Sequence, residues 1–137
     1  MGESMAKRIG SVPYLNSAPL TCGIEGETEF LPPNRLAKRL RTGGLATGLV
    51  SITEVLYNDL YDILDGIAVA SDGPVKSVFV AYKKPLEQVE TIHCDTASLS
   101  SVNLLKVTLA KRGLSPRFEP FGDYDRAAER DAVLLIG

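Results

Sequence analysis

The segment that decides the fold reads Arg8-Ile9-Gly10-Ser11-Val12-Pro13-Tyr14-Leu15-Asn16-Ser17-Ala18-Pro19-Leu20. Its first residues are typical of a short β-strand, which we expect to end near Ser11. A turn that carries Tyr14 and Asn16 follows, and the next four residues are able to start a helix. Asn16 would then lie just beyond the carboxyl end of a strand, where open α/β sheets bind ligands.

Strand and helix signals alternate along the rest of the chain. We expect strands at 7–11, 28–31, 45–50, 67–70, 75–82, 89–94, 116–120 and 132–136, and helices at 17–23, 34–41, 51–60, 99–112 and 124–130. This alternation predicts an α/β fold with right-handed βαβ units and a mostly parallel sheet. Because Lys83-Lys84-Pro85 changes the composition, we expect a first lobe over 1–83 and the first part of a second lobe over 84–137.

The helix expected over 34–41 would begin with Asn34 as its N-cap. Leu36, Ala37 and Leu40 recur on one helix face and would pack on the sheet. The basic residues between them would form a solvated outer face.

The composition narrows the function classes. A net charge of −2 over 137 residues offers no general basic field for nucleic acid or an anionic membrane. No apolar run approaches the roughly 20 residues that span a bilayer. Met1–Lys7 has no apolar core behind its charges, which argues against a secretory signal, and Met5 is consistent with an alternative start. We therefore expect a cytoplasmic protein, with neither nucleic acid nor membrane as a partner.

Cysteine and histidine give no sign of metal or redox chemistry. Cys22 and Cys94 lie far apart and outside any C-x-x-C pattern, so zinc and thioredoxin-like interpretations fail on spacing. In a reducing compartment both would be free thiols. The single histidine, His93, ends a predicted strand, and no Ser or Asp partner is marked by spacing. This favours a structural or solvated side chain over a general base.

Hydroxyl side chains gather at the strand-to-helix junction Asp95–Ser101. The first N–H groups of a helix have no internal partner and carry the positive end of its macrodipole, so amides and hydroxyls together would bind a carboxylate there. The alternative is an ordinary N-cap, with Ser98 or Thr96 capping and the other hydroxyls solvated. Both interpretations stay open.

Two further junctions also admit two interpretations. Ser71–Ser77 is a turn followed by a strand, and Ser77 would face either a cleft or solvent. Ser51 and Glu54 have the spacing of a capping box, which explains both residues without a function.

The turn after the first expected strand also admits two interpretations. Asn16 would contact a ligand or form an Asx-turn, and Tyr14 would be a cleft wall or part of the core. Three of these junctions lie at or near carboxyl ends of predicted strands, which converge on one edge of a doubly wound sheet.

Three segments resemble, in order and spacing, the chorismate dehydratase family of the futalosine route to menaquinone: Val12–Leu20, Ser71–Val78 and Asp95–Ser101. The resemblance extends from about Arg8 to Gly137. The related dihydroxynaphthoate synthase of that route has a Cys-Pro-Asn-Asp type of turn, unlike Pro13–Asn16. The resemblance implies a type II periplasmic-binding-protein fold, with two α/β lobes that close on a ligand. It also implies conversion of chorismate into 3-[(1-carboxyvinyl)oxy]benzoate and water, without a metal or an organic cofactor.

The resemblance assigns roles by position. It implies that Asn16 orients the substrate near the reacting carbons, and that backbone amides at Ser51 face the substrate. Carboxylates would be held by Ser77 and by the junction hydroxyls, which include Thr96, Ser98 and Ser100. No well-marked base is present, in keeping with the family picture in which a carboxylate of chorismate takes the proton.

The last residues of the sequence suggest how much of the second lobe it contains. Ala132–Ile136 has the pattern of a buried strand, and the chain ends one residue later, where the family usually continues with an acidic residue. We therefore expect the amino-terminal half of a two-lobed protein, with the second lobe only begun and little activity of its own. The alternatives are a non-catalytic carboxylate-binding module, or an inactive fragment that forms a homodimer through its last strand.

Overall fold

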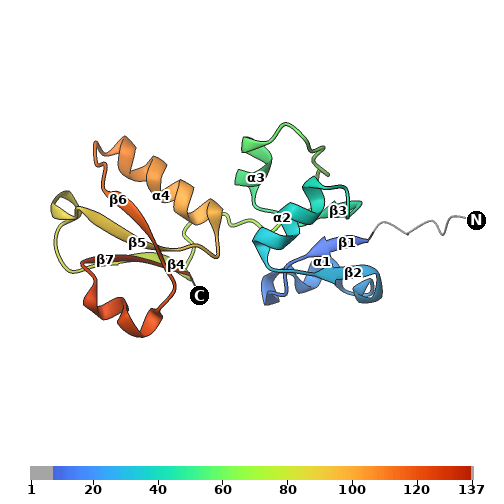
Figure 1. The fold of residues 1–137 in the computed structure, drawn as a ribbon, viewed down its shortest axis with the longest axis horizontal. Helices are drawn as coiled ribbons and strands as arrows, with labels where there is room; N and C mark the ends of the chain where they lie inside the picture. Colours follow the sequence, from blue (N-terminus) through green and yellow to red (C-terminus); the bar gives the residue numbers. More distant parts are fainter. Residues whose placement is uncertain (1–7, 137) are drawn as a thin grey trace, which may run out of the picture. The chain divides into compact units, whose positions relative to one another are not determined.

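A computed structural model describes residues 8–136 of the chain (Figure 1). It contains two compact α/β units, one extending to Ala70 and the other beginning at Ser71. The expectations for Met1–Lys7 and for the residue after Ile136 concern positions outside the described range.

The first unit is built on a three-stranded parallel sheet in the order β2-β1-β3. The strands are β1 (Ile9–Ser11), β2 (Thr28–Phe30) and β3 (Thr47–Gly48). The helices are α1 (Ala18–Thr21), α2 (Pro33–Arg41) and α3 (Ile52–Tyr57), with 3-10 turns η1 (Leu15–Ser17) and η2 (Glu25–Glu27). The alternation predicted from the sequence is confirmed here, and the elements other than α2 are shorter than expected.

Helix α2 packs on β1 through a glycine. Leu36 is fully buried, and Ala37 is 9% exposed, which confirms the predicted inner face of the helix. A Cβ atom at Gly10 would lie 2.4 Å from Cδ1 of Leu36 and 2.7 Å from Cδ1 of Leu45. The missing side chain at Gly10 therefore lets these two leucines approach the strand closely.

Two predictions for the first unit are wrong. The N-cap of α2 is Pro32 rather than Asn34, because Pro33, with its φ angle already helical, occupies the first turn. Residues 67–70 form no strand, and Ile67 and Val69 are 60% and 44% exposed. A strand needs a neighbour for its N–H and C=O groups, and no described strand pairs with this segment.

The second unit has a four-stranded sheet in the order β4-β7-β5-β6. The strands are β4 (Val78–Tyr82), β5 (Thr91–Asp95), β6 (Arg117–Phe121) and β7 (Ala132–Ile136). The remaining elements are α4 (Leu99–Lys111) and the 3-10 turns η3 (Leu86–Gln88) and η4 (Tyr124–Glu129). Strand β5 is parallel to β6 and β7, whereas β4 is antiparallel to β7.

One face of this sheet is covered by α4, and the segment that contains η4 lies on the other side (Figure 1). The core under α4 contains Ile92, Cys94 and Leu134 from the sheet, together with Leu109 from the helix. Among residues 8–136, no helix is long and apolar enough to cross a bilayer.

The pairing of β4 and β7 changes two expectations. All five residues of β4 pair with β7, so this strand belongs to the second unit, although the sequence placed it in the first lobe. In addition, β7 lies between β4 and β5, so both of its edges already have partners. In the described part of the chain, β7 therefore offers no free edge through which a second copy could pair with the last strand.

Candidate functional site

The loop after β1 is held by Ser17, a residue that the sequence analysis did not select. Ser17 is 1% exposed, and its Oγ lies 2.7 Å from both the Val12 and the Tyr14 carbonyl oxygens. Its backbone N–H also donates to the Tyr14 carbonyl, at 3.0 Å. A buried hydroxyl that bridges two carbonyls fixes the course of this loop.

Asn16 and Tyr14 are presented on the outside of that loop. Asn16 is exposed, and its side chain makes no hydrogen bond with any residue of the described range, so no Asx-turn is found. Tyr14 is 45% exposed and is therefore not a core residue. The loop leaves the amide of Asn16 available to a ligand.

Ser51 follows β3, and β3 is the neighbour of β1, so Ser51 and Asn16 lie beyond the carboxyl ends of adjacent parallel strands. The Ser51 Oγ accepts a hydrogen bond from the Thr53 N–H at 3.2 Å, which confirms the predicted cap of α3. Glu54 is 6% exposed, and its carboxylate binds Arg41 and the Tyr61 hydroxyl, each at 2.9 Å. Burial, and then the bond to Glu54, raise the pKa of Tyr61.

Replacing Ser51 with alanine is expected to lower the free energy of unfolding by about 1 kcal/mol, because the cap of α3 is lost. Urea unfolding of the wild type and the variant measures this change. Ser51→Asn is the matched control, since asparagine caps about as well as serine. Equal losses in both variants would show that the cap does not stabilise the unit.

In the second unit, the antiparallel pairing of β4 with β7 brings Ser77 next to the carboxyl ends of the parallel strands β5 and β7. Val78 starts β4 opposite Ile136, the last residue of β7, and Asp95 ends the neighbouring β5. The exposed Ser77 therefore lies at the same edge as the Asp95–Ser101 junction. The sequence analysis left open whether Ser77 faces a cleft or solvent, and the pairing of β4 with β7 places it beside the carboxyl end of β7.

At the start of α4 an N-cap lies close to the exposed hydroxyl of Thr96. The Ser98 Oγ accepts from the Ser101 N–H at 3.3 Å and from the Ser101 hydroxyl at 3.0 Å, so Ser98 is the N-cap. Thr96 is exposed, and its hydroxyl has no hydrogen bond within residues 8–136. Ser100 lies half-buried in the first turn. Because a hydroxyl accepts two bonds and donates one, Ser98 still has a proton to offer a ligand.

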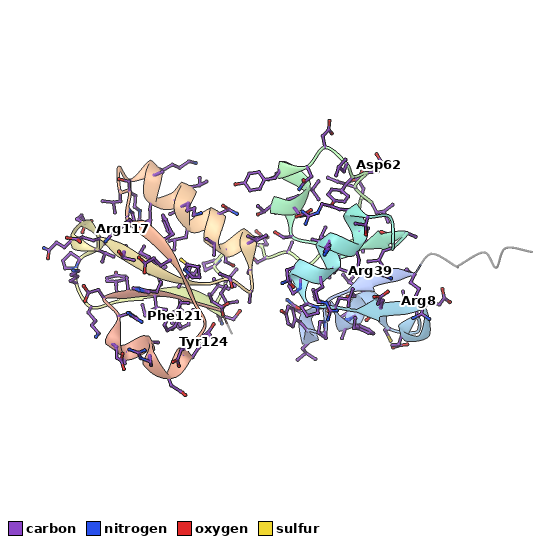
Figure 2. The ribbon with its side chains drawn as sticks, in the orientation of Figure 1. Arg8, Arg39, Asp62, Arg117, Phe121 and Tyr124 are labelled. Carbon is purple, nitrogen blue, oxygen red and sulfur yellow. The ribbon has the colours of Figure 1, made fainter. Side chains whose placement is uncertain are left out.

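Tyr124 is a second residue that the sequence analysis missed. Its hydroxyl contacts the Asp95 carboxylate and the carbonyl and N–H of Ile136, at 3.0 and 3.4 Å for the last two. Figure 2 shows its ring near Phe121, on the lower side of the unit in that view. Burial first, and then the bond to Asp95, raise the pKa of Tyr124, so the phenol keeps its proton.

Near the amino ends of β5 and β7, the second unit has a depression of about 370 Å³. It is lined by Lys84, His93 and residues 129–131, among others. It carries both signs of charge, and Lys84 is already paired with Asp131 at 2.7 Å. None of the predicted site residues lines it.

His93 has the surroundings of a structural residue. Its side chain is 15% exposed, its Nε2 lies 3.6 Å from Glu119, and its ring meets the Phe121 ring edge to face. Both cysteines are free, and burial raises the pKa of Cys94. Across the described range, no cluster of three His, Cys, Asp or Glu side chains could hold a metal ion.

The structure is that of an α/β protein with mostly parallel sheets, in which polar side chains gather at strand ends in each unit. The chain belongs to a menaquinone-biosynthesis family, because the model of that family matches residues 7–137. It is also similar to the chorismate dehydratase of Thermus thermophilus, with 34% identity over 134 residues. The match covers 94% of this chain and 49% of the relative, so the chain spans about half the length of that relative. Both findings confirm the resemblance found in the sequence.

Proposed function

We propose that the protein containing this chain is a chorismate dehydratase, a hydro-lyase of the futalosine pathway to menaquinone. It would convert chorismate into 3-[(1-carboxyvinyl)oxy]benzoate and water. The observation that carries the proposal is the match to a chorismate dehydratase across nearly the whole chain. The family match to menaquinone biosynthesis supports the same pathway.

The reaction breaks a C–H bond at the ring carbon that bears the enolpyruvyl ether and a C–O bond at the neighbouring carbon. The proton and the hydroxide leave as water, and the ring becomes aromatic, so the driving force lies in the substrate. The protein has to orient two carboxylates and stabilise the charge that gathers on the ring carboxylate. Amides and hydroxyls at fixed positions can do this without a strong base.

The chain offers such groups at both sheets. The free amide of Asn16 would orient the reacting part of the substrate, beside Tyr14 and the amides that follow Ser51. At the second sheet, the carboxylate-holding groups would be Ser77, Thr96, Ser98 and Ser100, together with the first N–H groups of α4. A carboxylate of the substrate itself would accept the proton.

The same proposal includes a two-lobed periplasmic-binding-protein type of fold. The division of the chain into two compact α/β units supports it. The proposal also includes a cytoplasmic location, the compartment expected from the sequence.

The direct test incubates the full-length protein with chorismate and follows the loss of the diene absorbance, with mass spectrometry of the product. We expect turnover by the full-length protein and little by the 137-residue chain alone. Calorimetric binding of chorismate without product would instead identify a carboxylate-binding module. If neither binding nor turnover occurs, the proposed function is wrong.

A further inference from the structure

The Tyr124 hydroxyl lies where three segments of the second unit meet. It belongs to η4, and it contacts the Asp95 carboxylate at the end of β5 and both backbone groups of Ile136 at the end of β7. Strands β5 and β7 are neighbours in the sheet, so a single hydroxyl joins the ends of two adjacent strands. This contact lies at the edge that carries the carboxylate-binding groups of the proposed function.

The hydrogen bonds follow from the chemistry of the groups. A phenol has one proton, and the carboxylate of Asp95 is a stronger acceptor than the Ile136 carbonyl, so the proton goes to Asp95. The Ile136 N–H then donates to the phenol oxygen. Tyr124 is thus satisfied as a donor and as an acceptor.

Asp95 connects Tyr124 to the Asp95–Ser101 junction through its two carboxylate oxygens. Its Oδ2 is held by Tyr124, and its Oδ1 accepts from the Ala97 N–H at 2.7 Å. One residue further on, Ser98 is fixed by its two bonds to Ser101. The short segment that contains Thr96 is therefore held at both ends.

The contact between Tyr124 and Asp95 also controls where the negative charge of the Asp95 carboxylate lies. The amides at the start of α4 attract any carboxylate, including that of Asp95 a few residues upstream. With its Oδ2 bound to Tyr124, the Asp95 carboxylate is kept at the strand end. A released Asp95 would compete with a ligand carboxylate for the same N–H groups.

The ring of Tyr124 is placed independently of its hydroxyl. Its centroid lies 6.2 Å from that of Phe121, which is 8% exposed and packs in turn against His93. Tyr124→Phe should therefore keep the ring in place and remove only the hydrogen bonds.

We propose that Tyr124 is a positioning residue: by holding Asp95, it preorganises the Asp95–Ser101 junction to bind a substrate carboxylate. The inference rests on the proposed function, since the carboxylate is taken to be one of those on chorismate. Tyr124 acts through Asp95 and does not itself touch the reacting atoms.

The test compares Tyr124→Phe, Asp95→Asn and the double variant in the full-length protein, with chorismate as substrate. Losing a hydrogen bond to a charged group should raise KM roughly tenfold, while kcat changes by less than about twofold. Because Tyr124 acts through Asp95, Tyr124→Phe should change KM less in the Asp95→Asn background than in the wild type. Tyr82→Phe is the matched control, since Tyr82 is 55% exposed and its hydroxyl has no hydrogen bond in the described part of the chain.

Amide hydrogen exchange at Ala97 provides a measurement that does not need turnover. It should be faster in Tyr124→Phe than in the wild type and unchanged in Tyr82→Phe. If the wild type does not convert chorismate, the proposed function fails while the exchange still tests the contact. Unchanged exchange in Tyr124→Phe, or faster exchange with an unchanged KM, would overturn the positioning role.

Discussion

Replacing Asn16 with alanine is expected to lower the turnover of chorismate by about 10²–10³-fold, the loss typical of removing one preorganised donor at a reacting centre. The fold should be retained, because the Asn16 side chain is exposed and makes no hydrogen bond with the described residues. The loop is held by Ser17, which the substitution leaves in place. Turnover and thermal unfolding of the full-length variant measure the two effects separately.

Leu15→Ala is the matched control for Asn16→Ala. Leu15 is the preceding residue of the same loop and is 90% exposed, so its truncation changes neither the core nor the expected substrate contacts. Wild-type turnover in Asn16→Ala would refute the role of that residue. A similar loss in both variants would instead assign the effect to the loop as a whole.

The largest expected effect on stability concerns the contact between Gly10 and Leu36. Leu36→Ala removes a fully buried side chain and should lower the free energy of unfolding by about 2–5 kcal/mol. Gly10→Ala should cost about 1–3 kcal/mol, because its Cβ would lie 2.4 Å from Cδ1 of Leu36. In the Leu36→Ala background the added methyl group meets one leucine fewer, so the same substitution at Gly10 should cost clearly less.

Urea unfolding of the two single variants and the double variant gives the coupling between these positions. Gly26→Ala is the control, since no atom of the described residues, apart from the chain neighbours, lies within 4 Å of a Cβ at that glycine. We expect it to change stability by no more than about 0.5 kcal/mol. If the losses in free energy of unfolding caused by Gly10→Ala and Leu36→Ala simply add in the double variant, the close approach of α2 to β1 is contradicted.

Much of the secondary structure could be predicted because it depends on local patterns. The buried strand at 132–136 and the helix α4, expected at 99–112, lie within one residue of their predicted bounds. The strand expected at 67–70 failed because a strand also requires a partner, and hydrophobic residues alone do not provide one. The inclusion of β4 in the first lobe failed for the same reason, since its partner β7 lies far along the chain.

In the candidate site, too, some residues could be predicted from local sequence patterns and others could not. Asn16, Ser51 and Ser98 could be selected from the sequence because each follows a strand within a few residues. Ser17 and Tyr124 could not be selected in this way. Ser17 looks like any small residue that precedes a helix, and Tyr124 bonds to Asp95 across 29 positions of the chain.

The sequence by itself determined the alternation of strands and helices, the cap of α3, and the resemblance to the chorismate dehydratase family, because these depend on residues close together in the chain. Only the tertiary structure decided the strand order β4-β7-β5-β6, which brings Ser77, Asp95 and Tyr124 to one edge. Strand order depends on hydrogen bonds and packing between distant segments, and local patterns do not specify which distant segments will meet.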